Sequence, residues 1–206
     1  MLTLAEGRTL TDDAHASVIA GLAKTYGATH TAGHRLLSLA TEVARYWRTL
    51  RIDYKYKVDE SGKPWALRSM KLRSSRRFWY FSSALHFLAF GPRVTPPERL
   101  NAAAVERFMK TMGGNPAVRF IDAAKQLSVN EERMRLLLGI YDEIHSRSAD
   151  SDVRATLDKL AAEEMENEPV FVELRESTRQ LHRAMADIVL HLRQPDLQEM
   201  VEMFLL

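Results

Sequence analysis

The apolar positions of this 206-residue chain recur at three- and four-residue steps almost from end to end, which is the period of one face of an α-helix. No stretch alternates strictly between apolar and polar residues, as a half-buried strand would. Between Gly33 and Lys57 the recurring positions are Leu39, Val43, Tyr46, Leu50 and Tyr54. The pattern predicts an all-α protein, a helical bundle with two long antiparallel N-terminal helices followed by several shorter helices.

Turn residues divide the N-terminal part into a helix over 12–26 and the two long helices over 33–57 and 65–90. Pro64 suits a first helical turn, because its missing N–H would have no partner there. The helix from Trp65 to Phe90 is basic in its first half and rich in Phe and Leu in its second. We therefore expect burial to increase toward Phe90.

Shorter helices are predicted beyond the prolines at 92, 96 and 97, each with a polar residue or a proline at its start. The expected ranges are 98–112, 116–126 with Asn115 as N-cap, 130–146, 151–167 with Ser151 as cap, 169–192 and 195–206. The turn over 91–97 is the one boundary that the composition suggests. It divides the chain into a basic helical module, 1–92, and an acidic helical subdomain, 93–206, which can share one core.

The charge of the chain is unevenly distributed. The formal net charge is +2, but residues 45–77 hold eleven Lys or Arg against Asp53, Asp59 and Glu60, an excess of eight positive charges, so the remainder carries −6. Concentrated positive charge attracts nucleoside triphosphates, nucleic acid or an acidic protein surface. The alternative is a solvated face balanced by acidic helices elsewhere in the fold.

Several classes of protein are excluded or disfavoured by residue content. The chain has no cysteine, which removes disulfides, thiolate catalysis and Cys-based metal sites and favours a cytoplasmic location. No run approaches 18 apolar residues, and Met1 to Arg8 lacks the order of a signal peptide. We expect neither a membrane span nor export.

Enzyme motifs are mostly missing. There is no glycine-rich phosphate loop, no G-x-S-x-G and no H-E-x-x-H. His30 and His34 are four residues apart, but zinc needs three or four convergent ligands. Arg175 and His182 have the spacing of ribonucleases of the HEPN type, a match expected by chance in a chain with seven histidines. We expect His182 to be a hydrogen-bonded helix residue.

The basic segment combines the side chains that hold phosphate oxygens. Arg45, Thr49 and Asp53 form a polar strip on the first long helix. Arg68, Lys71 and Ser75 share a face of the second, with Ser74 and Arg76 at its flanks. Helices joined by a short turn pack antiparallel, so the two strips should lie close together. Each charge-assisted bond to phosphate contributes about 1.5 to 3 kcal/mol.

The same segment resembles a known family. Arg45-Tyr-Trp-Arg-Thr, Asp53-Tyr and Lys63-Pro-Trp-Ala-Leu-Arg-Ser-Met-Lys-Leu-Arg-Ser-Ser-Arg look like the helical region that follows the catalytic domain in bacterial nucleotidyltransferases of the DNA polymerase β type. The resemblance covers roughly residues 1–92 and is strongest over 45–77. It implies contacts to a triphosphate from Lys71, Ser74, Ser75 and Arg76, and less directly from Arg68 and Lys63.

The chain departs from that family at its catalytic motif. The family needs a Gly-Ser turn and an Asp-x-Asp pair on a strand to hold metal ions, and no such strand is predicted here. Asp150 and Asp152 have the spacing, but their polar surroundings predict a helix cap. Whether the chain is an enzyme stays open. The resemblance implies a helical module that is not catalytic alone and has no cofactor of its own, with Mg²⁺ and the nucleotide bound together with a separate catalytic domain.

Two other functions remain open. A nucleic-acid-binding protein could use Trp47, Trp65 and Trp79 to stack on bases, although we expect these side chains to pack in the core. An interaction protein could dock a partner, or a second copy in a homo-oligomer, through its acidic half and the apolar tail Met200–Leu206.

Overall fold

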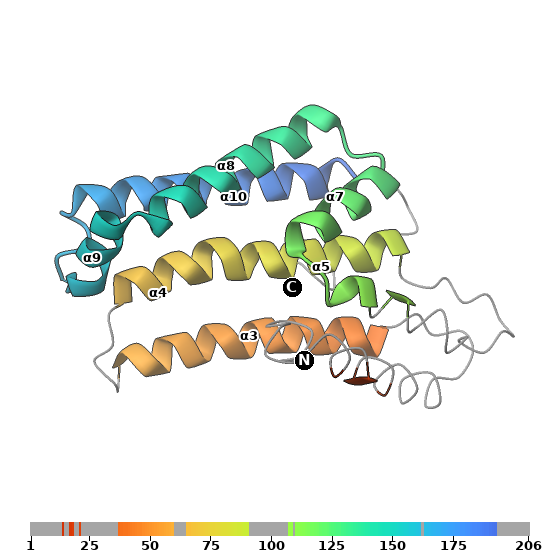
Figure 1. Cartoon of the computed structure of the whole chain (residues 1–206), viewed down its shortest axis with the longest axis horizontal. Helices are drawn as coiled ribbons and strands as arrows, with labels where there is room; N and C mark the ends of the chain where they lie inside the picture. Colours follow the sequence, from red (N-terminus) through yellow and green to blue (C-terminus); the bar gives the residue numbers. More distant parts are fainter. Residues whose placement is uncertain are drawn as a thin grey trace, which may run out of the picture. The chain divides into compact units, whose positions relative to one another are not determined.

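The computed structural model describes residues 14, 17, 18, 21, 37–59, 65–90, 107, 108, 110–161 and 163–192. Its helices are α3 (Leu37–Asp59), α4 (Trp65–Lys71), the π-helix η1 (Leu72–Arg76), α5 (Arg77–Phe90), α7 (Pro116–Gln126), α8 (Glu131–Ala149), α9 (Ser151–Lys159) and α10 (Pro169–Leu190) (Figure 1). The described residues contain no strand. The all-α class predicted from the periodicity is confirmed.

The chain forms two compact units, and each takes segments from both halves of the sequence. Unit 1 comprises Met1–Tyr46, Ser82–Leu127 and Leu197–Leu206, and unit 2 comprises Trp47–Phe81 and Ser128–Asp196. These bounds differ from the predicted 1–92 and 93–206 because aromatic pairs join the two halves within each unit. The ring centroids of Phe87 and Phe108 lie 4.9 Å apart in unit 1, and those of Phe78 and Tyr141 lie 4.1 Å apart in unit 2.

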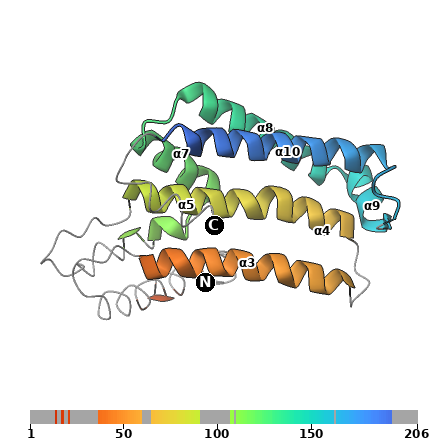
Figure 2. The same cartoon turned by 180° about the vertical axis from the view of Figure 1, so that it is seen from behind.

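In unit 2, α8 and α10 lie side by side, as both views show (Figures 1 and 2). Helix α4 contacts α9 and α10, and η1 contacts α8 and α10. A core cluster at these contacts consists of Ala66, Met70, Leu157, Phe171 and Leu174. Burial of one large apolar side chain stabilises the fold by about 1.5 to 3 kcal/mol. Phe171 and Leu174 belong to the buried face of α10, together with Thr178, Leu181, Met185 and Ile188.

In unit 1, every residue from Ser82 to Leu88 is buried, so the predicted increase in burial holds as far as Leu88, whereas Phe90 at the end of the helix is exposed. Arg119 of α7 is also buried, with 1% of its surface exposed. Its Nη2 donates to Ser82 Oγ at 2.9 Å, and its Nη1 donates to the carbonyl of Met112. These bonds satisfy a guanidinium that would be costly to bury without partners. Burial lowers the pKa of Arg119 to about 10.

Side-chain caps begin the helices of the C-terminal half. The Asn115 side chain accepts from the Ala117 N–H at 2.8 Å, with Pro116 in the first turn as predicted. Asn130 accepts from the Glu132 N–H at 2.8 Å. Each such cap satisfies an amide that has no intrahelical partner.

The helix predicted over 151–167 is shorter than expected. It ends at Lys159, because Leu160 adopts an extended backbone and packs against the core cluster. Its cap is Asp150 rather than Ser151: the Asp150 carboxylate accepts from the Asp152 N–H at 2.9 Å and the Val153 N–H at 3.1 Å. The prediction that Asp150 and Asp152 belong to a helix cap is confirmed.

The residue ranges of α3 and of the continuous run of α4, η1 and α5 are close to those of the two predicted long helices. The antiparallel packing of these helices stays a prediction. The predicted helix over 12–26 falls largely outside the described residues. The pair His30 and His34, the boundary over 91–97 and the helix over 195–206 lie outside them. In the described part of the chain no helix is both long and apolar enough to cross a membrane.

Candidate anion-binding site

Five of the seven predicted phosphate-binding residues lie on α4 and η1. Lys71 is exposed and shares a flank of the helix with Ser75, whose Oγ donates to the Lys71 carbonyl at 3.2 Å. Arg68 and Arg76 are half-buried. The structure therefore brings Lys71 and Ser75 together, and their contact with phosphate stays a prediction.

Ser74, another predicted residue, is not exposed beside them. Ser74 is buried, and its Oγ donates to the Met70 carbonyl at 2.7 Å, so its hydroxyl faces the protein interior. Arg45 belongs to unit 1 and forms an ion pair with Glu42 at 2.9 Å. Lys63 lies outside the described residues.

The helix widens at η1, and its own side chains give the reason. Ser74 and Ser75 both donate to carbonyls four residues earlier, and hydroxyls bonded in this way compete with the backbone hydrogen bonds of an α-helix. A π-turn inside an α-helix changes the phase of the residues that follow and is frequent at functional sites. Arg73 and Arg77 lie four residues apart across this turn, on the opposite flank from Lys71.

His182 of α10 contacts the flank of the helix that holds Arg73 and Arg77. Its Nε2 lies 2.9 Å from the Arg73 carbonyl oxygen, and its Nδ1 lies 2.6 Å from Nη1 of Arg77. A carbonyl can only accept and a guanidinium can only donate, so Nε2 carries the proton and Nδ1 accepts from Arg77. Burial, and then the charge of Arg77, lower the pKa of His182 to about 4. The expectation of a hydrogen-bonded helix histidine is confirmed.

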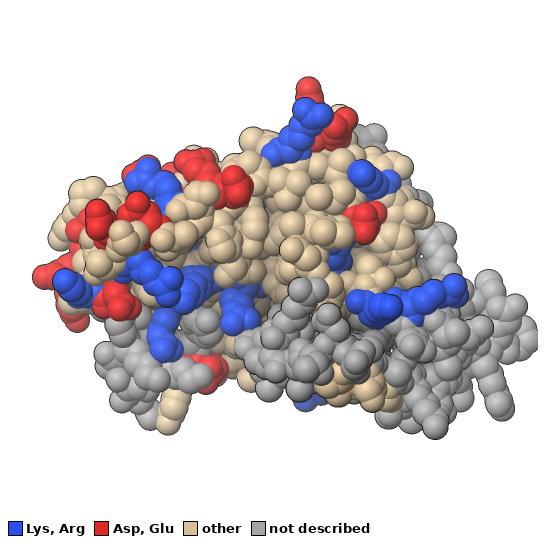
Figure 3. Space-filling model, viewed as in Figure 1, with Lys and Arg blue, Asp and Glu red and all other residues tan. Residues whose placement is uncertain are grey.

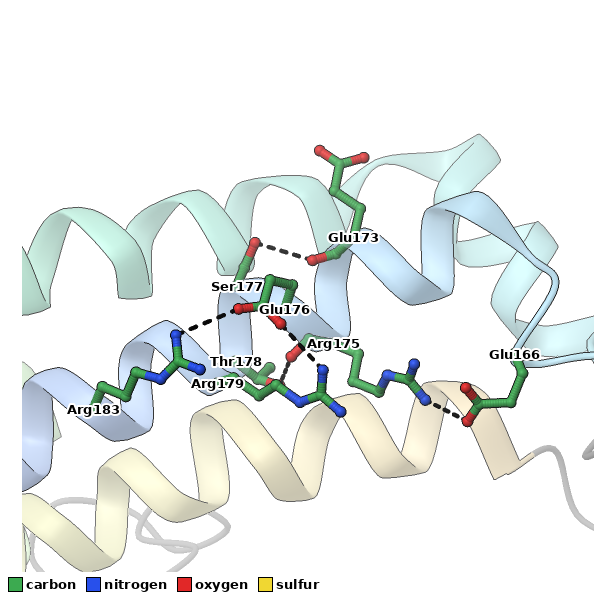
Figure 4. Close-up of polar contacts among 8 residues, drawn as sticks. All are labelled: Glu166, Glu173, Arg175, Glu176, Ser177, Thr178, Arg179 and Arg183. Carbon is green, nitrogen blue, oxygen red and sulfur yellow. Dashed lines mark hydrogen bonds and ion pairs between the residues drawn. The ribbon is translucent and has the colours of Figure 1, made fainter.

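Two arginines of α10 lie where this helix contacts α4 and η1. Arg175 and Arg179 are one helical turn apart, and their guanidinium groups extend toward the ribbon of α4 and η1 (Figure 4). Arg175 forms an ion pair with Glu166, and Arg179 forms one with Glu176 at 3.1 Å. Glu176 is shared with Arg183, whose Nη1 lies 3.6 Å away. We call Arg73, Arg77, Arg175 and Arg179 the arginine cluster.

Neighbouring arginines lower the pKa of two members of the arginine cluster, whereas the hydrogen bond to Glu166 raises the pKa of Arg175. The pKa of Arg73 is lowered by burial and then by the charges of Arg175 and Arg179. Burial, and then the charges of Arg51 and Arg73, lower the pKa of Arg77 to about 10. A base whose pKa is lowered by its neighbours is held in a positive potential. An anion placed there would relieve the repulsion.

The cluster is short of negative partners. Arg73 Nε donates to Ser69 Oγ at 3.1 Å, and among the described residues neither Arg73 nor Arg77 forms an ion pair with a carboxylate. In the part of the chain that the structure describes, the carboxylates paired with these four guanidinium groups are those of Glu166 and Glu176. On the face shown in Figure 3, Lys and Arg side chains gather over α4, while many Asp and Glu side chains lie over α8 and α9.

The tryptophans offer little to a nucleobase. Trp47 is 7% and Trp79 6% exposed, and Trp47 is stacked on Tyr80 with ring centroids 5.3 Å apart. The expectation of core packing is confirmed for both, whereas Trp65 is half-buried. Within the described residues no three His, Asp or Glu side chains group as metal ligands.

Sequence analysis missed the arginine cluster because it joins helices about a hundred residues apart. A signal was present: Arg73 and Arg77, and Arg175, Arg179 and His182, repeat at steps of three or four residues that place each set on one helical face. Nothing in the chain indicated that these two faces meet.

Comparisons of the chain with protein-family models, with curated proteins and with solved structures found no match.

Proposed function

We propose that this chain is a helical phosphate-recognition module that binds a nucleoside triphosphate at the arginine cluster. The observation that carries the proposal is the meeting of four guanidinium groups from two helices with two carboxylates among the described residues. A guanidinium presents its N–H groups as a planar fork that matches two phosphate oxygens. Each charge-assisted bond contributes about 1.5 to 3 kcal/mol.

Two observations favour a nucleotide over a nucleic-acid strand. Each pair of arginines spans a single helical turn, about 5.4 Å, which suits a compact triphosphate. A bound single strand normally stacks its bases on aromatic side chains, and Trp47 and Trp79 are buried.

The resemblance of residues 45–77 to the helical region of DNA polymerase β-type nucleotidyltransferases supports the same ligand. On that resemblance the module serves a cytoplasmic nucleotidyltransferase whose Asp-x-Asp pair and Mg²⁺ are supplied by another domain. This chain then binds the triphosphate and performs no chemistry alone. Lys71 and Ser75, on the opposite flank of the helix, are given no phosphate contact in this proposal.

The test is calorimetric titration of the full chain with ATP and with GTP, each with Mg²⁺, at low and high salt. We expect binding in the wild type that weakens with salt. Replacing Arg73 and Arg179 together by Gln should weaken it roughly 10- to 100-fold, since about 1.4 kcal/mol corresponds to a tenfold change in Kd. Arg135→Gln is the matched control, because Arg135 is 78% exposed on α8 and its ion pair in the described part of the chain is with Glu131. Lys71→Gln should also leave the affinity unchanged.

Three results would count against the proposal. The first is no binding of either nucleotide at millimolar concentration. The second is a loss of affinity in Lys71→Gln that the Arg73 and Arg179 variant lacks, which would move the site to the flank predicted from the sequence. The third is binding of single-stranded RNA far tighter than that of ATP, which would favour the nucleic-acid function.

A further inference from the structure

Unit 1 contains a hollow of about 580 Å³ that the proposed function does not use. It is lined by His86 and Phe90 of α5, by Arg107, Phe108 and Thr111, and by Asp122 and Lys125 of α7. This volume falls within the range of small-molecule sites, which combine aromatic walls with a few polar groups.

His86 gives the hollow its most unusual property. Its side chain is 1% exposed, and neither ring nitrogen has a hydrogen-bond partner among the described residues. Buried polar side chains almost always have such partners, and each exception requires an explanation. A ligand group that reaches the ring would supply one.

The imidazole is also held in a defined chemical state. Burial, and then the charge of Arg119, lower the pKa of His86 to about 4, and the nearby Phe108 backbone opposes this shift without reaching hydrogen-bond geometry. At neutral pH the ring is therefore uncharged and offers one donor and one acceptor. A neutral polar atom of a ligand is its natural partner.

Aromatic rings surround His86. The Phe108 ring stacks on the imidazole with centroids 4.7 Å apart and planes 28° apart. The Phe90 ring is tilted by 47° at 5.0 Å, and Phe90 is 39% exposed. An exposed ring at the edge of a hollow is an apolar surface that a planar ligand would cover.

The remaining lining is charged and mostly positive. Arg107 and Lys125 are exposed cations, and Asp122 is the one carboxylate among the described lining residues. The Thr111 hydroxyl donates to the Arg107 carbonyl at 3.0 Å, which leaves its oxygen able to accept. The excess of cations favours a ligand with a negative group.

We propose that this hollow binds a small planar aromatic molecule that carries an acidic group. The ring packs against Phe90 and Phe108, a polar ring atom bonds to His86, and the acidic group is held by Arg107 and Lys125. The inference concerns unit 1 alone and stands whether or not the arginine cluster binds nucleotides.

The experiment uses four probes on the full chain: indole-3-acetate and AMP, which carry a carboxylate and a phosphate, and indole and adenosine, which lack the acidic group. Ligand-observed NMR should give a Kd of millimolar or below for at least one acidic probe and at least tenfold weaker binding of its neutral counterpart. Binding should move the imidazole ¹⁵N signals of His86 in the labelled protein.

Surface variants keep the test independent of folding. Replacing Arg107 and Lys125 together by Gln should weaken the binding of the acidic probe at least tenfold. Lys110→Gln, which removes an exposed cation outside the lining, should leave its affinity unchanged.

Two results would overturn the proposal: no probe saturating below 10 mM, or binding that leaves the His86 signals in place. A third such result is that an acidic probe binds the Lys110→Gln variant and the double Arg107 and Lys125 variant with equal affinity. Binding of AMP that is lost only when Arg73 and Arg179 are replaced would assign that probe to the arginine cluster instead.

Discussion

His86 and His182 both have a pKa of about 4, yet among the described residues only His182 finds partners for its ring nitrogens. His182 holds α10 against η1 through a proton on Nε2 and a lone pair on Nδ1. His86 has the same two capacities with no described group to use them. That His182 would be hydrogen-bonded could be expected from the sequence, but its partners could not, because Arg73 and Arg77 come from a helix more than a hundred residues earlier.

The neutral state of His182 makes the stability of the fold depend on pH. An unfolded histidine has a pKa near 6.5, so below that pH the unfolded chain binds a proton that the folded chain refuses until about pH 4. The contribution of His182 to the free energy of unfolding should therefore be fully present above pH 6.5 and should decrease as the pH falls toward 4. One pKa unit corresponds to about 1.4 kcal/mol, and solvent screening at this half-buried ring reduces the effect, so we expect His182 to account for a loss of about 1 to 2 kcal/mol by pH 4.5.

Urea unfolding at pH 7.0, 5.5 and 4.5 measures this loss. Glutamine at position 182 keeps a donor and an acceptor but does not titrate, so His182→Gln should show a flatter pH dependence than the wild type. His145→Gln, which replaces an exposed histidine of α8, is the matched control. Equal slopes for the two variants would contradict the assignment.

At the level of single helices, starts were easier to predict than interruptions. The Asn115 and Asn130 caps and Pro169 follow from local chemistry, since a side-chain oxygen or a proline acts on the first turn that contains it. The π-turn at η1 was missed: Ser74 and Ser75 bond backward within the helix, and they could equally have pointed to solvent. Ser74, which the resemblance placed among the phosphate ligands, donates to the Met70 carbonyl instead.

The Asp150 cap provides a test at this scale. Asp150→Ala removes two side-chain hydrogen bonds at the start of α9, whose Leu157 is fully buried in the core cluster. We expect a loss of about 1 kcal/mol, or about 2 to 4 °C in Tm for a chain of this size. Thermal unfolding measures it. Asp142→Ala, at an exposed position of α8, should change Tm by less, and an equal change would argue against the cap.

At the level of the whole molecule, the basic segment was visible in the sequence but its neighbours in space were not. Residues 45–77 carry an excess of cations, and one hypothesis was that acidic helices of the C-terminal half balance it. Instead α10 adds Arg175 and Arg179 to the flank that holds Arg73. Which face of α10 meets η1 depends on the packing of Phe171 and Leu174 in the core, a long-range choice that no local pattern contains.

The composition of the two units predicts how fragments will behave. The separate chains 1–92 and 93–206 should each retain helix without cooperative unfolding, because each unit needs Phe87 with Phe108 or Phe78 with Tyr141 across that cut. Circular dichroism during heating and the dispersion of ¹H–¹⁵N spectra test this. An equimolar mixture is the control and should regain part of the dispersion. A cooperative transition of either fragment near the Tm of the full chain would contradict the prediction.

The π-turn at Leu72–Arg76 also makes the number of residues in this helix matter. The π-turn accommodates one residue more than an α-helical turn would hold. Removing one residue there would let the chain return to ordinary α-helical winding and would leave the residues that follow in nearly the same rotational phase, so Phe78 would stay buried. A one-residue deletion in the regular α-helix α10 would instead rotate everything downstream of it by about 100°.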